Sequence, residues 1–314
     1  MIRKLFVLFS LSFIFLFSGC VSLHNTVLSA EEESLLYPIE TYVPEKFDWQ
    51  EVCPGISRCD FKNPEFPIIY HAVKIDLTLA GLELVCFPDR DFTLQESRIE
   101  NESITQPFIF KGMRTSKFAE LYNCTVAVNL SPFGGKNGTW NLAAKLGSKR
   151  QIVGLHVADG LVVSAPVKRY AAIAFKRETG VDGELFWRAS IEKNQTEETA
   201  AASDYAFGGF YIVLENGKVA EKFVRNHDSR TGLGISEDGC TLYILVVEGE
   251  VLSQSEGLSY PQCGEIFKAM GCENALEVDG GGSSDLCING KSLLSYKVNR
   301  IQGNSLGFFV EGLK

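Results

Sequence analysis

The chain has 314 residues, of which 45% are hydrophobic and 22% are charged, and its formal net charge at pH 7 is −9. This ordinary globular composition allows one large domain or two small ones, with a sizeable core. The negative charge argues against a nucleic-acid partner, because binding to a phosphate backbone needs a broad basic surface.

The first 19 residues have the pattern of an export signal. Arg3 and Lys4 precede a run of mainly apolar residues, 5–17, which is too short for a comfortable membrane span. The next residues, Ser18-Gly19-Cys20, resemble the end of a bacterial lipoprotein box, although Phe17 stands where Leu is usual. We expect export, cleavage after residue 19 and lipid on Cys20, so that the chain is held at a bacterial membrane only by this anchor, in the periplasm or at the cell surface. An ordinary secretory signal or an N-terminal anchor is the alternative.

The cysteine content also favours export. The chain has nine cysteines, and eight remain if Cys20 carries lipid. An even set in an exported chain suggests disulfides, so we expect most of the eight to be paired. Cys53 and Cys59 are candidates for a local bridge, and the remaining connectivity stays open. Zinc is a weaker hypothesis, because the sequence has no C-x-x-C and its four histidines are scattered.

Residues 20–67 are predicted to be a tether and lead-in, and residues 68–314 a single domain. The acidic run Glu31-Glu32-Glu33 is expected to be solvated. Prolines argue against long helices in this stretch, and they are Pro38, Pro44, Pro54, Pro64 and Pro67.

The elements predicted from residue 68 onward are mostly short strands. Residues 71–79 and 82–87 alternate in polarity and are predicted to form a hairpin. A modest helix is expected over 115–122, followed by a buried strand over 125–129. Strands over 152–157 and 161–164 flank the tight turn at Asp159-Gly160, and further strands are expected at 171–175 and 185–189.

The second half of the chain continues this pattern. Strands over 210–214 and 218–223 flank the Asn216-Gly217 turn, and 241–247 is a strongly apolar strand. The best helix spans 261–270, a strand follows at 275–278, and the last strand spans 305–310. The strand, helix and strand from 241 to 278 would form one crossover unit. We therefore predict an α+β domain with a mixed or mostly antiparallel sheet and few helices.

The strand over 275–278 ends abruptly in a carboxylate, Asp279. Three glycines and two serines follow it: Gly280, Gly281, Gly282, Ser283 and Ser284. Consecutive glycines can turn backbone N–H groups toward one point, which makes a nest for an anion. A carboxylate beside such a nest could act as a general acid or base. The alternative is a simple β-turn that begins with an acidic residue.

The segment 271–284 resembles the signature of the phosphodiester glycosidase family, roughly L-G-x-x-x-A-x-N-L-D-G-G-G-S-S. Glu277 stands where the family usually has Asn, and Val278 where it has Leu. Five further segments resemble family landmarks in the same order, and they are 127–133, 207–217, 229–234, 257–260 and 300–304. In the first of them, Leu130 and Ser131 replace two glycines that follow Asn129 in the family pattern.

The resemblance implies a hydrolase of sugar-1-phosphodiesters in glycans or glycoconjugates, acting through an oxocarbenium-like transition state. Asp279 and Arg230 are then the expected catalytic residues, with Asp279 transferring a proton and Arg230 binding phosphate through its two-pronged guanidinium. Asn129, Thr231 and the 280–284 loop would bind substrate. Each has a structural alternative: a turn-capping Asp, an Arg that bridges strands, and an Asn in a local turn. Glu277 would share the face of Asp279 on a straight strand, and two carboxylates on one face would raise one pKa.

The expected partner is a carbohydrate or a sugar phosphate. The sequence predicts no cofactor and no metal, leaves open a divalent cation near Asp279, and does not set the oligomeric state. His71, His156 and His227 are expected to be structural or surface residues. A second hypothesis is a non-catalytic glycan- or phosphate-binding lipoprotein on the same fold. The glycines lost after Asn129 favour that hypothesis, whereas the Asp279 loop and Arg230 favour the hydrolase.

Overall fold

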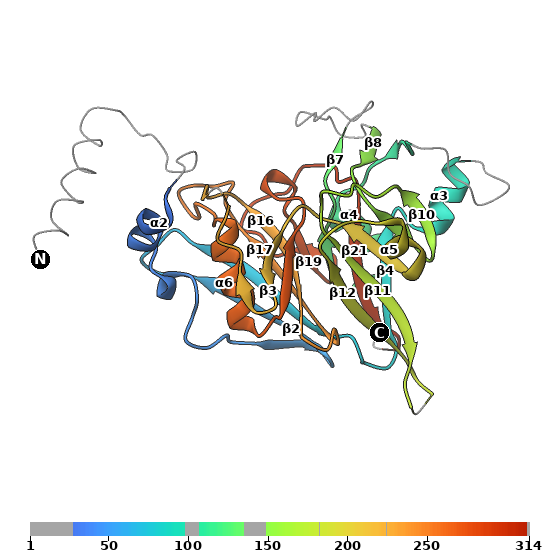
Figure 1. The fold of residues 1–314 in the computed structure, drawn as a ribbon, viewed down its shortest axis with the longest axis horizontal. Coiled ribbons are helices and arrows are strands. Elements are labelled where there is room, and N and C mark those ends of the chain that lie inside the picture. Colours follow the sequence, from blue (N-terminus) through green and yellow to red (C-terminus); the bar gives the residue numbers. More distant parts are fainter. Residues whose placement is uncertain (1–27, 98–106, 135–148, 182, 224, 313–314) are drawn as a thin grey trace, which may run out of the picture.

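The computed structural model describes residues 28–97, 107–134, 149–181, 183–223 and 225–312 (Figure 1). The predicted signal peptide and Cys20 lie outside these ranges. None of the helices within them combines the length and the apolar character needed to cross a membrane.

The largest sheet, called here the large sheet, has eight strands joined by antiparallel pairing throughout. Its strands, in spatial order, are β1 (Gln50–Cys53), β2 (Ile56–Lys62), β3 (Ile69–Asp76), β17 (Thr241–Val247), β16 (Arg230–Ile235), β18 (Asn274–Glu277), β14 (Ile212–Glu215) and β15 (Lys218–Val219). Because β17 and β18 both pair antiparallel with β16, they run parallel to each other, and the helix between them makes the predicted crossover.

Three smaller sheets complete the β structure. The β11 sheet contains β10 (Leu161–Ser164), β9 (His156–Ala158), β13 (Tyr205–Gly208), β11 (Ala172–Thr179) and β12 (Leu185–Glu192). The β6 sheet contains β20 (Lys291–Ser292), β19 (Leu286–Ile288), β6 (Val126–Asn129), β21 (Ser305–Val310) and β4 (Leu82–Phe87). A three-stranded sheet contains β5 (Phe110–Lys111), β8 (Lys149–Ile152) and β7 (Phe133–Gly134).

The helices are short. They are α2 (Ala30–Leu36), α3 (Arg90–Ser97), α4 (Thr115–Leu121), α5 (Glu197–Ala202) and α6 (Tyr260–Met270), with 3-10 turns at Ile39–Thr41 and Gly281–Ser283. The predicted helices at 115–122 and 261–270 are confirmed as α4 and α6. Helix α6 begins at a capping box in which Ser259 and Gln262 satisfy each other's backbone N–H groups, and it ends at Gly271, whose φ of 94° needs a residue without a Cβ.

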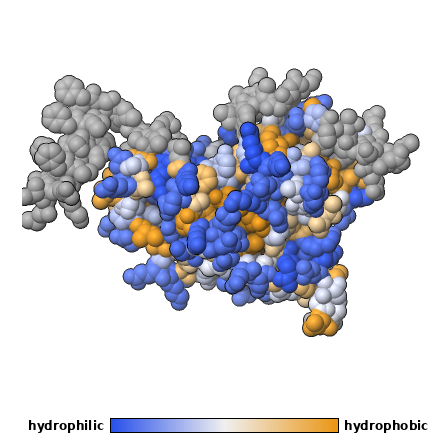
Figure 2. All heavy atoms as spheres, viewed as in Figure 1, coloured by the Kyte–Doolittle hydropathy of each residue, from blue (hydrophilic) through white to orange (hydrophobic). Residues whose placement is uncertain are grey.

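Both faces of the large sheet are buried, which explains its long apolar runs. Alternate residues of β17 divide between two cores. Leu242, Ile244 and Val246 pack in the core that this sheet shares with the β6 and β11 sheets. Tyr243 and Leu245 pack on the other face, in the core under α6. The predicted α+β domain with mainly antiparallel sheets is confirmed, and Figure 2 shows mainly hydrophilic residues on the face in view, with smaller hydrophobic areas among them.

The described part of the predicted lead-in is folded onto the domain. Strand β2 pairs along its whole length with β3, so the predicted boundary between residues 67 and 68 falls between two paired strands. Tyr37 and Tyr42 are buried in the core under α6. The expectation of a solvated acidic run is wrong for Glu33, which is buried. Its hydrogen bond from Arg225 offsets the cost of burying the carboxylate.

The prediction of disulfides is not supported. All eight described cysteines are free thiols, namely Cys53, Cys59, Cys86, Cys124, Cys240, Cys263, Cys272 and Cys287. Six of them are buried and serve as small apolar side chains, divided between the two cores on opposite faces of the large sheet. Burial raises the pKa of these thiols, which makes them poor nucleophiles in the folded protein.

We therefore expect the eight described cysteines to react as thiols when the protein is denatured without reductant. In the native protein, Cys53 and Cys240 should react first, because they are the two that are partly exposed. Counting labelled cysteines by peptide mass spectrometry checks both statements. Four or more of the eight recovered as disulfides in denatured, unreduced protein would contradict this expectation.

Candidate active site

Loops from two sheets meet around Asp279. In the large sheet, antiparallel pairing sets the start of β16 beside the ends of β17 and β18. In the β6 sheet, Asn129 at the end of β6 pairs with Ser305 at the start of β21. The backbone N–H of Asp279 donates to the carbonyl of Leu130 at 2.8 Å, which joins the loop after β18 to the segment after β6. The site thus lies where a rigid sheet delivers several loops.

Asn129 uses its side chain to hold this junction together. Its Nδ2 donates to the Asp279 carbonyl at 2.6 Å, and its Oδ1 accepts from the Thr231 hydroxyl at 3.1 Å and from the Asp285 backbone N–H at 3.0 Å. Asn129 is 1% exposed and Thr231 is fully buried. These contacts position the loop of Asp279, and the predicted role of both residues in binding substrate stays a prediction.

Each glycine of the loop has its own structural reason. A Cβ on Gly280 would lie 2.7 Å from the Ser229 carbonyl oxygen, and Gly281 has a φ of 57°. A Cβ on Gly282 would lie 2.7 Å from Nη2 of Arg300. The glycines therefore allow close approach of one backbone segment and one guanidinium.

The predicted anion nest loses several donors to the protein itself. The N–H of Gly281 donates to the Ser229 carbonyl at 2.8 Å. Ser283 and Ser284 donate their N–H groups to Gly280 and Gly281 within a 3-10 turn, at 3.1 and 3.0 Å. Positive charge beside the loop comes instead from a side chain.

That side chain is Arg300, in the segment before β21. Its Nη1 donates to Oγ of Ser283 at 3.1 Å, and Nε2 of Gln302 donates to the Ser283 carbonyl at 2.8 Å. Desolvation raises the pKa of Asp279 to about 7, although a hydrogen bond to Ser283 and the charge of Arg300 both lower it. Asp279 nevertheless keeps part of its surface exposed. A carboxyl with this pKa can release or accept a proton at neutral pH.

Arg230 lies beside the loop but turns its guanidinium elsewhere. Its Cα would be 3.6 Å from a Cβ on Gly280, yet its Nε donates to the Leu258 carbonyl at 2.9 Å. Its Nη2 donates to the Asn226 carbonyl at 2.7 Å, and the guanidinium stacks 4.2 Å from the centre of the Tyr260 ring. These contacts are those of an arginine that secures the segment before α6, and its predicted catalytic role stays a prediction.

Glu277 is buried on the same side as Arg230. Burial raises the pKa of Glu277 to about 7, against the lowering effects of the Arg230 charge and the Cys263 thiol. For Asp279, the positive charge that lowers the pKa is that of Arg300. Desolvation raises the pKa of both Glu277 and Asp279. The sequence had instead suggested that the two carboxylates would repel each other on one face of a strand.

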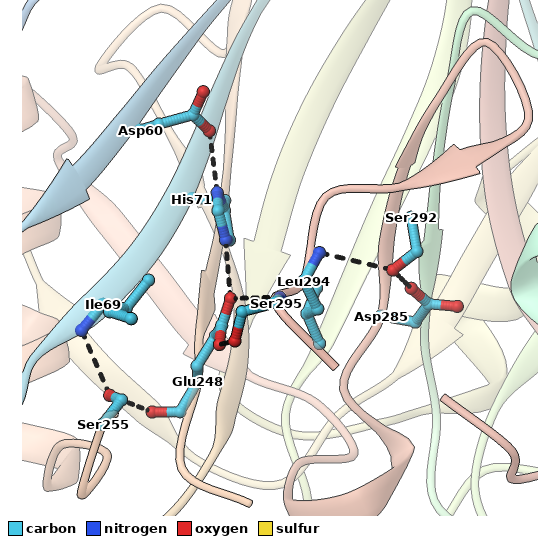
Figure 3. Close-up of polar contacts among 9 residues, drawn as sticks. All are labelled: Asp60, Ile69, His71, Glu248, Ser255, Asp285, Ser292, Leu294 and Ser295. Atoms are coloured by element: carbon cyan, nitrogen blue, oxygen red, sulfur yellow. Dashed lines mark hydrogen bonds and ion pairs between the residues drawn. The ribbon is translucent and has the colours of Figure 1, made fainter. Parts of the chain in front are cut away.

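A polar network, buried at His71 and Glu248, supports the segment that carries Arg300. His71 on β3 contacts Asp60 through Nδ1 at 2.7 Å and Glu248 through Nε2 at 3.0 Å (Figure 3). Glu248 also accepts from the backbone N–H of Ser295 at 2.8 Å and from the Ser295 hydroxyl. Nearby, the Ser292 hydroxyl donates to Asp285 at 2.6 Å (Figure 3). Glu248 thus ties Ser295 to the end of β17 in the large sheet, and Asp285 holds Ser292 beside the start of β19.

Two of the histidines are structural, as expected. His71 is the centre of this network, and His156 is fully buried, with Nε2 2.9 Å from the Pro88 carbonyl oxygen. Burial lowers the pKa of His156 to about 4, so it is neutral. His227 is buried against Tyr37, with ring centres 4.5 Å apart.

The sequence identified the loop but missed its cation. Arg300 was recognised only as part of a family landmark, and Arg150 on β8 gave no signal at all, because a Lys-Arg pair in a polar stretch resembles any surface strand. In the part of the chain that the structure describes, no three His, Cys, Asp or Glu side chains gather in a way that could hold a metal ion. The expectation of no cofactor stays a prediction.

Comparisons with known proteins give information on the family and the fold. A family model described as phosphodiester glycosidase matches residues 118–309. The SPbeta prophage-derived uncharacterized protein YomE of Bacillus subtilis (strain 168) is 26% identical over 157 residues, which are 46% of this chain and 23% of that protein. The match therefore spans less than a quarter of the length of that relative.

Two solved structures resemble the fold. A hypothetical protein from Synechocystis has a TM-score of 0.57 and 14% identity, over 84% of this chain and 64% of that one. The catalytic domain of zebrafish N-acetylglucosamine-1-phosphodiester alpha-N-acetylglucosaminidase, auto-inhibited by its pro-peptide, has a TM-score of 0.52 and 16% identity, over 82% of this chain and 84% of that one. At these identities the likeness concerns the fold.

The His71 network predicts a pH-dependent contribution to stability. The carboxylates of Asp60 and Glu248 outweigh burial and raise the pKa of His71, so its contribution is present below about pH 6.5 and is lost as pH rises through the raised value. Hydrogen bonds lower the pKa of Asp60 and Glu248, so their contribution is present above about pH 4.5 and is lost in acid. The network should stabilise most between these limits.

We expect His71→Gln to lower the free energy of unfolding by about 3 kcal/mol near pH 6, because it leaves Glu248 buried without its charged partner. The loss should be smaller at pH 9, because the contribution of the wild-type network is lost as pH rises through the raised pKa of His71. Denaturant unfolding of both proteins at the two pH values measures this. Lys193→Gln, which breaks the exposed ion pair with Glu215, is the control and should change little at either pH. An equal loss for His71→Gln at both pH values would contradict the assignment.

Proposed function

This chain belongs to the phosphodiester glycosidase family, and we propose that it is an exported, membrane-anchored hydrolase that cleaves sugar-1-phosphodiester bonds in glycans or glycoconjugates. The observation that carries the proposal is the environment of Asp279. Desolvation raises the pKa of its carboxyl to about 7, Ser283 and the charge of Arg300 lower it, and Arg300 is bonded to Ser283 of the same loop, at a junction of loops from two sheets.

The proposed reaction breaks the bond between the anomeric carbon and the phosphate oxygen. The bonding electrons pass to that oxygen, water attacks the anomeric carbon through an oxocarbenium-like transition state, and the water proton passes to Asp279. The products are the free sugar and a phosphomonoester. Arg300 stabilises the charge that develops on the leaving phosphate. Phosphate is a good leaving group, so proton removal from water is the step that needs a residue, and we assign Asp279 as the general base.

Asn129 supports this chemistry by positioning. Its amide holds the carbonyl of Asp279, and its oxygen accepts from Thr231 on the neighbouring strand. The orientation of the Asp279 loop is thereby fixed to the large sheet and the β6 sheet together. A carboxylate held on rigid elements keeps its geometry better than one on a free loop.

The alternative is a glycan- or phosphate-binding lipoprotein without turnover, and it rests on the replacement of two glycines after Asn129. Leu130 is buried, and its carbonyl accepts the Asp279 N–H. The hydroxyl of Ser131 accepts from Nδ2 of Asn304 at 3.0 Å. Both replacements are accommodated by packing that keeps the Asp279 loop in place, which favours the hydrolase.

We expect Asp279→Asn to reduce kcat/KM by roughly 10²–10⁴-fold on a chromogenic sugar-1-phosphodiester, because the amide cannot accept the proton. Wild-type kcat/KM should rise as pH increases through about 7 and then level off, since a general base acts in its ionised form. Rates across pH 5–9 measure both effects, and circular dichroism checks that the variant is folded.

Asp204→Asn is a matched control, because Asp204 accepts from the Arg177 backbone N–H and should not affect turnover. Full activity of Asp279→Asn would refute the assignment of the base. A folded wild type that binds sugar phosphodiesters but hydrolyses none of them would leave the binding-protein hypothesis standing.

Export and anchoring rest on the charged start, the apolar run and the Gly19-Cys20 pair. We expect the mature chain to begin at Cys20 and to carry lipid there. Mass spectrometry of the N-terminal peptide from membrane fractions checks this, and Cys20→Ala should release the protein from the membrane. An unlipidated mature terminus elsewhere, for example near Ala30, would contradict the proposal.

A further inference from the structure

Among the residues that the structure describes, Arg150 is a buried cation without a counter-ion. It is 0% exposed, and its guanidinium lies 5.3 Å from the centre of the Phe133 ring. Its Nε donates to the Ile301 carbonyl at 3.0 Å and its Nη1 to the Lys149 carbonyl at 3.3 Å, while its Nη2 has no partner among the described residues. Arginine stays charged in proteins, so burial without an anion is costly.

A second arginine lies next to it. The carbonyl that Arg150 binds belongs to Ile301, the residue after Arg300. Burial and then the charge of Arg300 lower the pKa of Arg150, which is the effect of two like charges at close range. Among the ion pairs of the described residues, none includes Arg150 or Arg300. The charge of Arg300 lowers the pKa of Asp279.

We propose that Arg300 and Asp279, backed by the buried charge of Arg150, form a pocket that binds a phosphomonoester dianion together with a proton. The anion reaches Arg300 and Asp279, which are both partly exposed. Arg150 acts from behind Arg300 and makes the pocket more positive than one arginine would. The role of this pocket in turnover rests on the proposed function, whereas the binding itself does not.

Charge balance supports the coupling to a proton. Two arginines and an ionised Asp279 carry a net charge of +1, which a phosphodiester monoanion neutralises. With Asp279 protonated the pocket carries +2, which a phosphomonoester dianion neutralises. Hydrolysis converts the monoanion into the dianion and moves one proton from water to Asp279. The pocket and its ligand therefore remain neutral in total before and after the reaction, so product and proton are held together and leave together.

Other titratable groups near the loop could also take up a proton. Glu277 has a pKa of about 7 and faces Arg230 and Cys263. Asp285 has a pKa of about 6 and is hydrogen-bonded to Ser292. Asp228 lies beside Gly281. Tyr296 is not a candidate, because burial raises the pKa of its hydroxyl and it already carries its proton at pH 8. The test must therefore assign the proton to Asp279 by substitution.

Calorimetric titration with methyl phosphate and dimethyl phosphate at pH 8 provides the test. Both probes carry a phosphate, but the first is a dianion and the second a monoanion. We expect methyl phosphate to bind at least ten-fold more tightly. Repeating the titration in two buffers of different ionisation enthalpy counts protons, and we expect net proton uptake with methyl phosphate only.

Substitutions then locate the charges. Arg300→Gln should weaken the binding of methyl phosphate about ten- to a hundred-fold, the range for a hydrogen bond to a charged group. Arg150→Gln should weaken it by a smaller factor, because the charge of Arg150 acts from behind Arg300 without touching the anion. The glutamine at 150 can still donate to the Ile301 carbonyl, and if this buried variant does not fold, Arg300→Gln alone decides. Lys218→Gln removes one exposed charge and should leave the affinity within two-fold. Asp279→Asn should abolish proton uptake while methyl phosphate still binds, whereas Glu277→Gln should retain the uptake.

Equal affinity for the two probes, unchanged binding in Arg300→Gln, or proton uptake that persists in Asp279→Asn would overturn the proposal. These measurements need no turnover. Proton-linked phosphate binding in a protein that hydrolyses nothing would therefore support the pocket and reject the proposed function. Turnover of a sugar phosphodiester with no binding of methyl phosphate would do the reverse.

Discussion

The side-chain amide of Asn129 connects the two sheets on which the site depends. It donates to the carbonyl of Asp279 after β18 and accepts from Thr231 on β16 and from the backbone of Asp285. A buried amide with these partners costs free energy if one of them is removed, because the others are left without a hydrogen bond. The position of the Asp279 loop is therefore set by packing between sheets as much as by the sequence of the loop.

The glycines and the arginines follow from that constraint. With the loop fixed against Ser229 on one side, its other side is open to Arg300, and a Cβ at position 282 would push the Arg300 guanidinium out of its present place. Arg300 is in turn held by its bond to Ser283 and by a segment that Glu248 secures through Ser295. The positive charge beside Asp279 thus comes from a residue about twenty positions further along the chain, supported by a network that begins at Asp60.

Prediction from the sequence succeeded where local patterns decide the structure. The capped helix α6 and the strand before Asp279 follow from periodicity, capping residues and glycines, and the order of the family landmarks indicated the fold. It failed where distant contacts decide. The even number of cysteines, in a chain that begins like an exported protein, suggested disulfides. The buried cysteines instead lie in two separate cores. The direction of the Arg230 guanidinium, at the start of β16, also depends on distant residues, which are Leu258, Asn226 and Tyr260, and its role as the phosphate ligand stays a prediction. Arg150 could not be identified without knowing that β8 lies against Ile301.

Desolvation links the unusual pKa values to the fold. It raises the pKa of Asp279 and Glu277 to about 7 and that of Asp285 to about 6, although all three would titrate near 4 in water. A carboxylate with an ordinary pKa is a weak base at neutral pH, so the loop sequence alone supplies a carboxyl but not its reactivity. The junction between the sheets supplies the low-polarity surroundings, and the nearby arginines limit how far the pKa rises. A substitution that admits water at Leu130 or Val278 would therefore weaken the base without touching Asp279, since both residues are buried against the loop that carries it.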